Sequence, residues 1–289
     1  MQCNRMRAAA GGLAGILFPA WRSFIKEEGL SGRKEGFVER KIYTARLNRK
    51  LLLSDPAQCF HLEFSVEGLE HFRFDAGQFV SMLATDGHGK HQTRAYSIAS
   101  APRENFFDLC VNRVESGFFS NLLCDLEAGD TLEFHGPHGL FVLRPLLTDT
   151  ILIATGTGVA PIRGFVEHLF PAENEDRSAG NHFWLMYGTR HESGIYYQRY
   201  FEKTAAEHAN FHYLPSLSRP HEGWEGLRGY VQTHVKRVLE GDPRILARNG
   251  SAAGMHAYIC GLNEMVSANR EQLAGLGWDK KQVHFERYD

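Results

Sequence analysis

The sequence predicts a two-domain fold, in which a small antiparallel β-barrel is followed by an α/β domain built on a parallel sheet. From about residue 37 to residue 144 the chain consists of short alternating runs separated by polar or glycine turns. After Pro145 apolar strands alternate with helical stretches, which is typical of a parallel sheet with helices on both faces. We therefore expect an N-terminal extension over 1–36, a barrel over 37–145 and an α/β domain over 146–289.

The barrel is predicted from period-two alternation of apolar and polar residues. The clearest strands are 78–84, 106–114 and 131–135, and only a short helix, starting at Ser120, interrupts the pattern. His135 and His138 flank Gly136 and Pro137, so we interpret both histidines as turn residues.

The second half alternates apolar strands with helical periods. Strands are expected at 151–154, 182–188, 211–218, 256–260 and 283–288, and helices at 161–170, 195–208, 230–240 and 263–276. The segment 241–254 contains Pro243, Asn249 and Gly250, so we interpret it as a loop.

Composition limits the classes of protein to which this chain can belong. A chain of 289 residues with 43% hydrophobic residues can form two cores of ordinary size. Its 32 Lys+Arg against 34 Asp+Glu give a formal charge of −2, so no global attraction to nucleic acid or to an anionic membrane is expected.

The cysteines and histidines predict no metal site. The five cysteines are an odd number at wide spacings and form no C-x-x-C pair, which argues against a disulfide framework, a zinc module and an iron–sulfur cluster. The fifteen histidines include no H-E-x-x-H motif.

The N-terminus superficially resembles a signal peptide or a short amphipathic anchor, because Arg5 and Arg7 precede an apolar stretch from Ala8 to Trp21. Glycines and Pro19 interrupt that stretch, and it is too short to span a bilayer. We interpret it as a poorly ordered extension, and we expect a cytoplasmic protein without a stable membrane span.

Two segments of the predicted barrel suit a flavin dinucleotide. In Arg94-Ala95-Tyr96-Ser97, arginine can chelate a diphosphate, tyrosine can lie against a flat ring, and serine can hydrogen-bond a ring nitrogen. In Gly117-Phe118-Phe119-Ser120, glycine allows a close turn, and Ser120 is a plausible N-cap of a helix whose N-terminus faces the diphosphate. Together they predict an FAD site.

A glycine turn follows the first strand of the α/β domain, in Ala154-Thr155-Gly156-Thr157-Gly158-Val159-Ala160-Pro161. Its backbone can approach a dinucleotide diphosphate at the N-terminus of the next helix. Pro161 stands where the third glycine of G-x-G-x-x-G would be, so the alternative is a tight strand-to-helix turn without a ligand.

Other residues are expected at the carboxyl edge of the same sheet. Arg219, after Ser218, and Arg228 can hold an extra phosphate, and Tyr230 can stack on adenine; the alternative is a pair of solvated surface arginines. Cys260 ends another strand on this edge, and a buried structural cysteine is the more frequent case for a single Cys.

These motifs, in this order, resemble the ferredoxin–NADP reductase family of FAD-containing oxidoreductases over about residues 37–289. Further landmarks of the resemblance include Phe74 to Val80, Cys110 to Arg113, Gly136 to Gly139, Cys260 to Met265 and Glu286 to Tyr288.

The resemblance implies roles for individual residues. Arg94 would contact the FAD diphosphate, Tyr96 would lie against the isoalloxazine, and Ser97 would hydrogen-bond near flavin N5. The FAD cradle would be completed by Ala95, Cys110, Val111, Asn112, Gly117, Phe118, Phe119 and Ser120. Gly156, Thr157, Gly158 and Pro161 would face the nicotinamide cofactor. Ser97, Cys260 and Glu286 would lie near the hydride path, and Tyr288 would be the aromatic residue that closes the flavin face, so all four are candidate catalytic residues. Asp289 follows Tyr288, whereas relatives often end in the aromatic residue itself.

The implied reaction is hydride transfer from NADPH to FAD, followed by release of single electrons to a separate carrier such as ferredoxin, flavodoxin or another iron–sulfur protein. NADH stays possible, because Pro220 and the Trp224-Glu225-Gly226 segment resemble NADH-using relatives and Glu225 can repel a phosphate. The alternatives are the reductase component of an oxygenase and an electron-relay or regulatory subunit with little nicotinamide turnover.

Overall fold

A computed structural model describes residues 40–171, 175–249 and 254–288, and Arg40–Asp289 form one compact unit. The expected N-terminal extension lies outside the described residues. Within them, no helix combines the length and the apolar character needed to cross a membrane.

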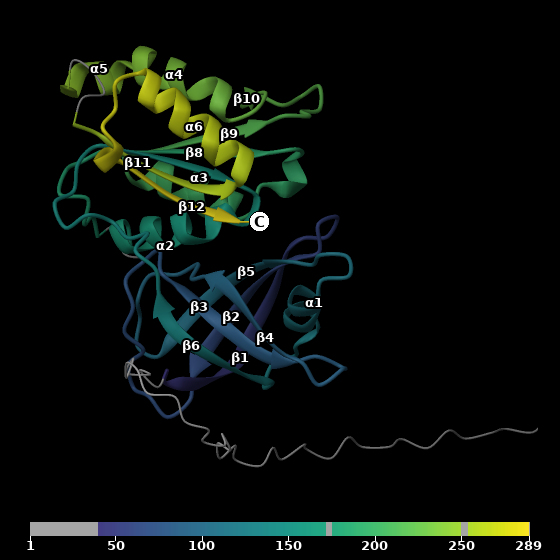
Figure 1. The fold of residues 1–289 in the computed structure, drawn as a ribbon. Coiled ribbons are helices and arrows are strands. Elements are labelled where there is room, and N and C mark those ends of the chain that lie inside the picture. Colours follow the sequence, from purple (N-terminus) through teal and green to yellow (C-terminus); the bar gives the residue numbers. More distant parts are fainter. Residues whose placement is uncertain (1–39, 172–174, 250–253, 289) are drawn as a thin grey trace, which may run out of the picture. The chain divides into compact units, whose positions relative to one another are not determined.

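The first sheet is antiparallel and has six strands in the order β4-β3-β6-β1-β2-β5 (Figure 1). These strands are β1 (Ile42–Ser54), β2 (Cys59–Val66), β3 (Phe79–Thr85), β4 (His91–Ser97), β5 (Phe106–Asn112) and β6 (Thr131–His138). The outer strands meet where Ile98 bridges to Leu109, and the Ala99 amide donates to the Asp108 carbonyl over 2.7 Å. The sheet therefore closes into the predicted barrel.

Aromatic side chains fill the barrel. Phe64 and Phe107 are fully buried and stacked, with ring centroids 5.4 Å apart, and Phe134 packs beside Phe107. The helix α1 (Phe118–Asp125) adds Phe119 and Leu123 to the same core. This aromatic interior follows from the alternation of the strands, which directs every second side chain inward.

The second sheet is parallel in all its pairings, in the order β10-β9-β8-β7-β11-β12. Its strands are β7 (Thr150–Thr155), β8 (Phe183–Thr189), β9 (Phe211–Leu217), β10 (Leu227–Arg228), β11 (His256–Leu262) and β12 (Val283–Tyr288). The chain runs outward from β7 through β8 and β9, then returns to place β11 on the other side of β7. The order therefore reverses between β7 and β11, where open α/β sheets bind ligands.

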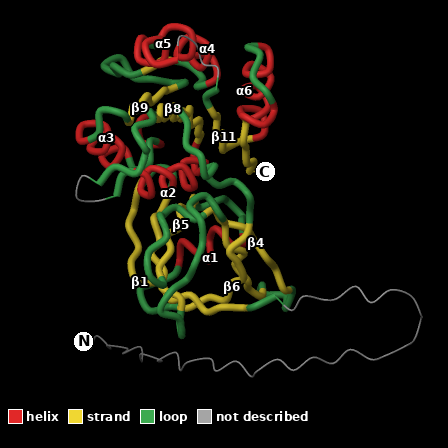
Figure 2. The backbone as a smooth tube through the Cα atoms, turned by 90° about the vertical axis from the view of Figure 1, so that its left-hand side faces the viewer, coloured by secondary structure: helices red, strands yellow, loops and turns green. Residues whose placement is uncertain are grey.

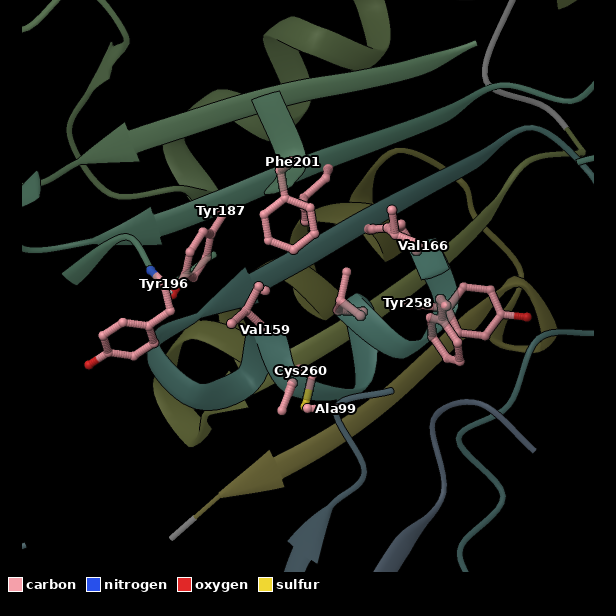
Figure 3. Close-up of a cluster of buried hydrophobic side chains, with 14 of the residues drawn as sticks. Ala99, Val159, Val166, Tyr187, Tyr196, Phe201, Tyr258 and Cys260 are labelled. Carbon is pink, nitrogen blue, oxygen red and sulfur yellow. The ribbon is translucent and has the colours of Figure 1, made fainter. Parts of the chain in front are cut away.

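Helices cover both faces of this sheet (Figure 2). On one face, α2 (Val159–Leu169) and α3 (Gln198–Glu207) pack on alternate residues of β7 and β8, and Figure 3 shows Val159, Val166 and Phe201 in this cluster. On the other face lie α4 (Gln232–Gly241), α5 (Pro243–Asn249) and α6 (Asn263–Gly275). The predicted fold class is confirmed.

Two local predictions were wrong. The segment 241–254 was expected to be a loop, but it contains helix α5, whose Ile245 is fully buried under the sheet. Pro243 is the first residue of α5, a position where proline costs no hydrogen bond. His135 and His138 were expected in a turn, but both belong to β6, and their ring nitrogens Nδ1 and Nε2 are 2.6 Å apart.

The barrel and α2 approach each other closely at Gly164. A Cβ atom at this position would lie 2.9 Å from the Ser100 carbonyl oxygen. A side chain here would push α2 away from strands β4 and β5, which carry Ser97 and Cys110. The absence of a side chain at Gly164 therefore permits the close contact between α2 and the barrel.

Candidate functional site

The glycine turn lies at the point where the order of the parallel sheet reverses. Gly156–Gly158 form a single 3₁₀ turn between β7 and α2. A Cβ on Gly158 would lie 2.2 Å from the Cys260 carbonyl oxygen, so the absence of a side chain lets the turn pack against β11. Gly156 has a φ of +52°, and a Cβ there would meet no described atom within 4 Å. Gly158 thus allows the turn to pack closely against β11, whereas Gly156 faces open space.

Four residues from three elements meet beside this turn. The Ser97 hydroxyl, at the end of β4, donates to Oε2 of Glu286 in β12 over 3.2 Å. The Tyr288 hydroxyl, also in β12, lies 3.2 Å from Ser97 Oγ, to which it donates, and 3.5 Å from the Thr157 carbonyl oxygen. Residues almost two hundred positions apart are therefore brought together, as the proposed hydride path requires.

Cys260 lies on the buried side of this cluster. It is fully buried in β11, where it pairs with Ala154 of β7 and Glu286 of β12. Burial raises the pKa of the thiol, and burial likewise raises the pKa of the Glu286 carboxyl, against the opposing effect of the Ser97 hydroxyl. The strand was expected to end at Cys260 but continues to Leu262, so the thiol belongs to the sheet rather than to a loop at its edge.

Arg94 and Tyr96 differ in their surroundings. Arg94 is exposed, and its guanidinium makes no hydrogen bond or ion pair with any described residue. Tyr96 is half-buried and packs against the barrel core. Alternation along β4 places them on one face of the strand, with Ala95 and Ser97 on the other. A cation without a protein partner beside a tyrosine fits a diphosphate that continues into a flat ring.

The proposed N-cap at Ser120 was wrong. Helix α1 begins at Phe118, with Gly117 as its N-cap. Ser120 Oγ instead accepts from the Val114 amide over 3.1 Å and donates to the Gly117 carbonyl over 3.2 Å. The side chain thus holds the turn before the helix, and the backbone N–H groups at the start of α1 are the groups available to an anion.

The remaining parts of the expected FAD cradle sit on β5 and α1. Cys110 and Val111 are buried, and Asn112 is half-buried at the end of β5. Cys110 Sγ lies 3.7 Å from Cys59 Sγ on the neighbouring strand. Phe119 is 4% exposed within the barrel core, so any contact with FAD at this residue comes from its backbone.

The residues expected near adenine lie at the carboxyl edge of β9 and β10. Arg219 is exposed, and its carbonyl oxygen lies 3.2 Å from His191 Nδ1. The Arg228 guanidinium donates to the carbonyls of Glu222 and Trp224, over 2.9 and 2.7 Å, and so braces the loop between these strands. Tyr230 is 65% exposed and is free to stack on a ring. Arg219 is therefore the better placed of the two arginines for a phosphate.

Two residues of the site were absent from the sequence prediction. Thr155 Oγ1 is buried at the carboxyl end of β7 and has no hydrogen-bond partner among the described residues. A Cβ on Gly139 would lie 3.0 Å from the Phe79 ring and 3.8 Å from Glu286 Oε1. Both stand in motifs that the sequence shows, but only the fold places Gly139 near Glu286 and the Thr155 hydroxyl next to Gly261.

The residues present fit two dinucleotides. The unpaired Arg94 guanidinium and the start of α1 suit one diphosphate, while Gly156 and the unpartnered Thr155 hydroxyl suit a second group at the reversal point. Across residues 40–171, 175–249 and 254–288, no group of three or more His, Cys, Asp or Glu side chains is placed to hold a metal ion.

Replacing Arg94 by alanine is expected to weaken FAD binding roughly ten- to hundredfold, because one charge-assisted contact with the diphosphate is lost. Flavin titration of the apoprotein measures this. Arg49→Ala, which removes an exposed arginine from β1, is the matched control and should leave the Kd unchanged. An unchanged Kd in the Arg94 variant would remove this side chain from the site.

Comparison with known protein families gives two matches. An oxidoreductase FAD-binding domain matches residues 44–143, and an oxidoreductase NAD-binding domain matches residues 152–271. The first match covers the barrel strands with α1, and the second begins in β7 and ends within α6.

Individual proteins are also similar. The chain is 40% identical over 245 residues to ferredoxin–NADP reductase B of Sorangium cellulosum, which covers 83% of this chain and 96% of the relative. It is 33% identical to the chloroplastic leaf isozyme 1 of Arabidopsis thaliana ferredoxin–NADP reductase, over 83% of this chain and 71% of the relative. A ferredoxin NADP⁺ reductase of Neisseria gonorrhoeae with bound FAD and NADP has the same fold, with a TM-score of 0.71, 22% identity, and coverage of 86% and 99% of the two chains.

Proposed function

The chain belongs to the ferredoxin–NADP reductase family, and we propose that it transfers a hydride from NADPH to FAD and then passes single electrons to a ferredoxin. The observation that best supports this is the cluster of Ser97, Glu286, Tyr288 and Thr157, because it joins the flavin strand of the barrel to the nucleotide turn of the parallel sheet. We propose domain limits of 37–145 for the FAD-binding barrel and 146–289 for the NADPH-binding domain.

FAD supplies a ring system that accepts two electrons as a hydride and releases them one at a time. The protein binds and orients the two rings and excludes water from between them. Arg94 and the start of α1 would hold the FAD diphosphate, Tyr96 would lie against the ring, and Ala95, Cys110, Val111 and Asn112 would form the wall beside it.

Ser97 is the residue we assign to the reacting edge of the ring. Its hydroxyl donates its one proton to the Glu286 carboxylate and accepts from the Tyr288 hydroxyl, so turning that O–H away from Glu286 would let it donate to the ring. Burial raises the pKa of Glu286, which favours its holding a proton closer to neutral pH than an exposed carboxyl would. Cys260 packs behind these groups and limits the space for the nicotinamide.

The diphosphate of the nicotinamide cofactor would bind at Gly156, Thr157, Gly158 and Pro161. Its adenosine end would lie near Ser218, Arg219, Arg228 and Tyr230. The Tyr288 hydroxyl lies 3.5 Å from the Thr157 carbonyl oxygen, so its ring would close the flavin face next to the nucleotide turn.

A ferredoxin is the acceptor that the relatives' names favour, and flavodoxin or another iron–sulfur carrier follows from the same single-electron chemistry. A cytoplasmic location is part of this proposal. Two other functions predict different results: the reductase component of an oxygenase would reduce that oxygenase's own carrier faster than free ferredoxins, and a relay subunit would accept electrons without oxidising NADPH.

Anaerobic rapid mixing tests the proposal. The flavin band of the FAD-loaded protein should bleach within one turnover on mixing with excess NADPH, and candidate ferredoxins or flavodoxins added afterwards should restore it. Flavin that stays oxidised with both NADPH and NADH would contradict the proposed function. Fast bleaching without reoxidation by any ferredoxin would favour a different carrier.

NADPH is expected to be preferred over NADH by roughly five- to hundredfold in kcat/KM, because an exposed arginine gains a contact with the 2′-phosphate that a hydroxyl does not offer. Arg219→Ala should lower this preference at least several-fold. Arg237→Ala, an exposed arginine on α4, is the control and should leave the ratio unchanged. Equal kcat/KM values for both cofactors in the wild type would instead indicate that the exposed Glu225 offsets Arg219.

A further inference from the structure

A cluster of buried charges joins the barrel to the helix that follows the glycine turn. Its centre is Asp108 of β5, whose side chain is 1% exposed, and Arg163 of α2, whose side chain is 12% exposed. Asp108 is also paired with Arg103 over 2.6 Å. Placing ions in a protein interior carries a large desolvation cost, and packed apolar side chains would stabilise such a contact as well or better. A contribution to stability therefore does not by itself account for these buried charges.

Arg163 contacts the barrel and its own helix together. Its Nη1 donates to the Ala99 carbonyl and lies 3.4 Å from Asp108 Oδ2. The same nitrogen lies 3.5 Å from Oε2 of Glu167, one turn further along α2. That Glu167 oxygen accepts from the Ala101 amide of the barrel over 2.8 Å. Two side chains of one helix thus bond to the backbone of one barrel segment, residues 99–101.

The guanidinium is also fixed by aromatic rings from α3 and its N-cap. It lies over the rings of Tyr197 and Tyr200, at 5.0 and 5.2 Å from their centroids. The Tyr197 hydroxyl lies 3.0 Å from His61 Nδ1 on barrel strand β2. Tyr197 adopts a φ of +59°, a conformation that non-glycine residues take rarely, so its position is set by these contacts.

The electrostatic surroundings are those of a permanently charged arginine. Burial raises the pKa of Asp108 to about 6, against the effect of Arg103 and Arg163. Burial and the neighbouring arginines lower the pKa of His61 to about 3, so this ring is neutral near pH 7. Arg163 therefore spans the boundary as a cation beside the Glu167 carboxyl, while Arg103 reaches Asp108 from within the barrel.

The segments that Arg163 joins are only two residues away, along the chain, from residues of both proposed cofactor sites. Ala99 follows Ser97 by two residues, and Asp108 precedes Cys110 by two. Arg163 follows Pro161 by two residues, in the helix that begins after Gly158. A shift of α2 relative to residues 99–101 would therefore change the distance between the nucleotide turn and the flavin strands.

We propose that Arg163 is a positioning residue, which fixes the glycine turn and helix α2 against strands β4 and β5 and so sets the separation of the nicotinamide and the flavin. This role rests on the proposed function. It acts on the reaction through geometry, since Arg163 bonds to Ala99 and Asp108 rather than to either cofactor site.

Arg163→Gln removes the charge and the bonds to the barrel, and Arg103→Gln is the matched control because it removes a partner of the same carboxylate without uncoupling α2. In Arg163→Gln, the rate of flavin reduction at saturating NADPH should fall roughly ten- to hundredfold, because small misplacements of reacting atoms are costly. The Kd values of FAD and NADP⁺ should change less than about threefold. In Arg103→Gln the rate should stay within about twofold of wild type.

A reduction rate in Arg163→Gln within twofold of wild type would overturn the proposal, as would an equal loss in Arg103→Gln. A loss of NADP⁺ affinity as large as the loss of rate would make Arg163 part of the nucleotide site instead. If Arg163→Gln does not fold, Arg163→Lys gives the same test, since lysine keeps the charge but cannot reproduce the planar fork, and a roughly three- to tenfold slower reduction is expected. A wild-type rate in that variant would overturn the proposal.

Amide hydrogen exchange tests the contact without turnover. In the wild type the Ala101 amide should be protected, and Arg163→Gln should increase its exchange at least tenfold, whereas Arg103→Gln should not. Unchanged exchange in Arg163→Gln would overturn the positioning role. If the wild-type flavin is not reduced by NADPH or NADH, the proposed function fails, and the exchange result still decides whether Arg163 couples the two sheets.

Discussion

Flavin reduction by NADPH is expected to slow roughly hundredfold in Ser97→Ala, with FAD affinity changed by less than about threefold. Ser97 Oγ bonds both to the Glu286 carboxylate and to the Tyr288 hydroxyl, each over 3.2 Å. Removing a hydrogen-bonding group placed at the reacting atoms typically costs two or more orders of magnitude. The side chain lost is small, so the barrel should keep its fold.

Stopped-flow absorbance at the flavin band measures this rate. Ser65→Ala is the control, because Ser65 lies in the same barrel, on β2, and bonds Asn48 rather than any residue of the cluster. Tyr288→Phe separates the two bonds to Ser97, since it removes the donor but keeps the ring. A wild-type rate in Ser97→Ala would show that this hydroxyl is a structural link between β4 and β12 and takes no part in hydride transfer.

Gly158→Ala is expected to destabilise the protein by roughly 3 kcal/mol or more and to remove NADP⁺ binding. The added Cβ would lie 2.2 Å from the Cys260 carbonyl oxygen and 2.9 Å from the Gly261 Cα, and both are backbone atoms that cannot rotate away. Forcing extra volume into such a contact separates β11 from the turn, and its cost is at the upper end of the range for overpacked sites. The turn would then no longer face the reversal point of the sheet.

Thermal or urea unfolding of the FAD-loaded protein, with NADP⁺ titration, checks this expectation. Gly156→Ala is the matched control in the same turn. Its Cβ would meet no described atom within 4 Å, so only the φ of +52° opposes it, at a cost of about 1 kcal/mol. Equal destabilisation by the two substitutions would mean that the turn is tolerant of volume and that backbone conformation alone limits it.

The order of elements was largely predictable from the sequence because it depends on local periodicity. The apolar runs within the expected strands 106–114 and 151–154 identify strands whatever they pack against, although the first strand ends at Asn112. The errors arose where a local sequence pattern is compatible with two different structures. Pro243 suggested a loop but begins helix α5, and the glycine–proline pair before His138 suggested a turn but lies within β6. Ser120 suggested a helix cap but bonds the turn before the helix.

The candidate site also has a part that could be predicted from the sequence and a part that could not. Arg94, Tyr96 and the glycine turn stand in short motifs whose residue types and order suit the binding of dinucleotides. One sequence was therefore enough to predict a flavin and a nicotinamide cofactor. Arg163 has no such signal: an arginine and a glutamate one turn apart on a helix are usually a solvated pair, and the partners Ala99 and Asp108 are more than fifty residues away.

The sequence by itself therefore determined the two kinds of domain and the family, because these depend on periodicity and on motifs within a few residues, and it supplied the candidate residues that we propose for each cofactor. Only the tertiary structure decided that Ser97 meets Glu286 and Tyr288, that Gly158 closes on Cys260, and that Arg163 joins the two layers. The physical reason is that close packing and buried charge pairs are set by where distant strands and helices meet, and no local pattern of residues encodes that distance.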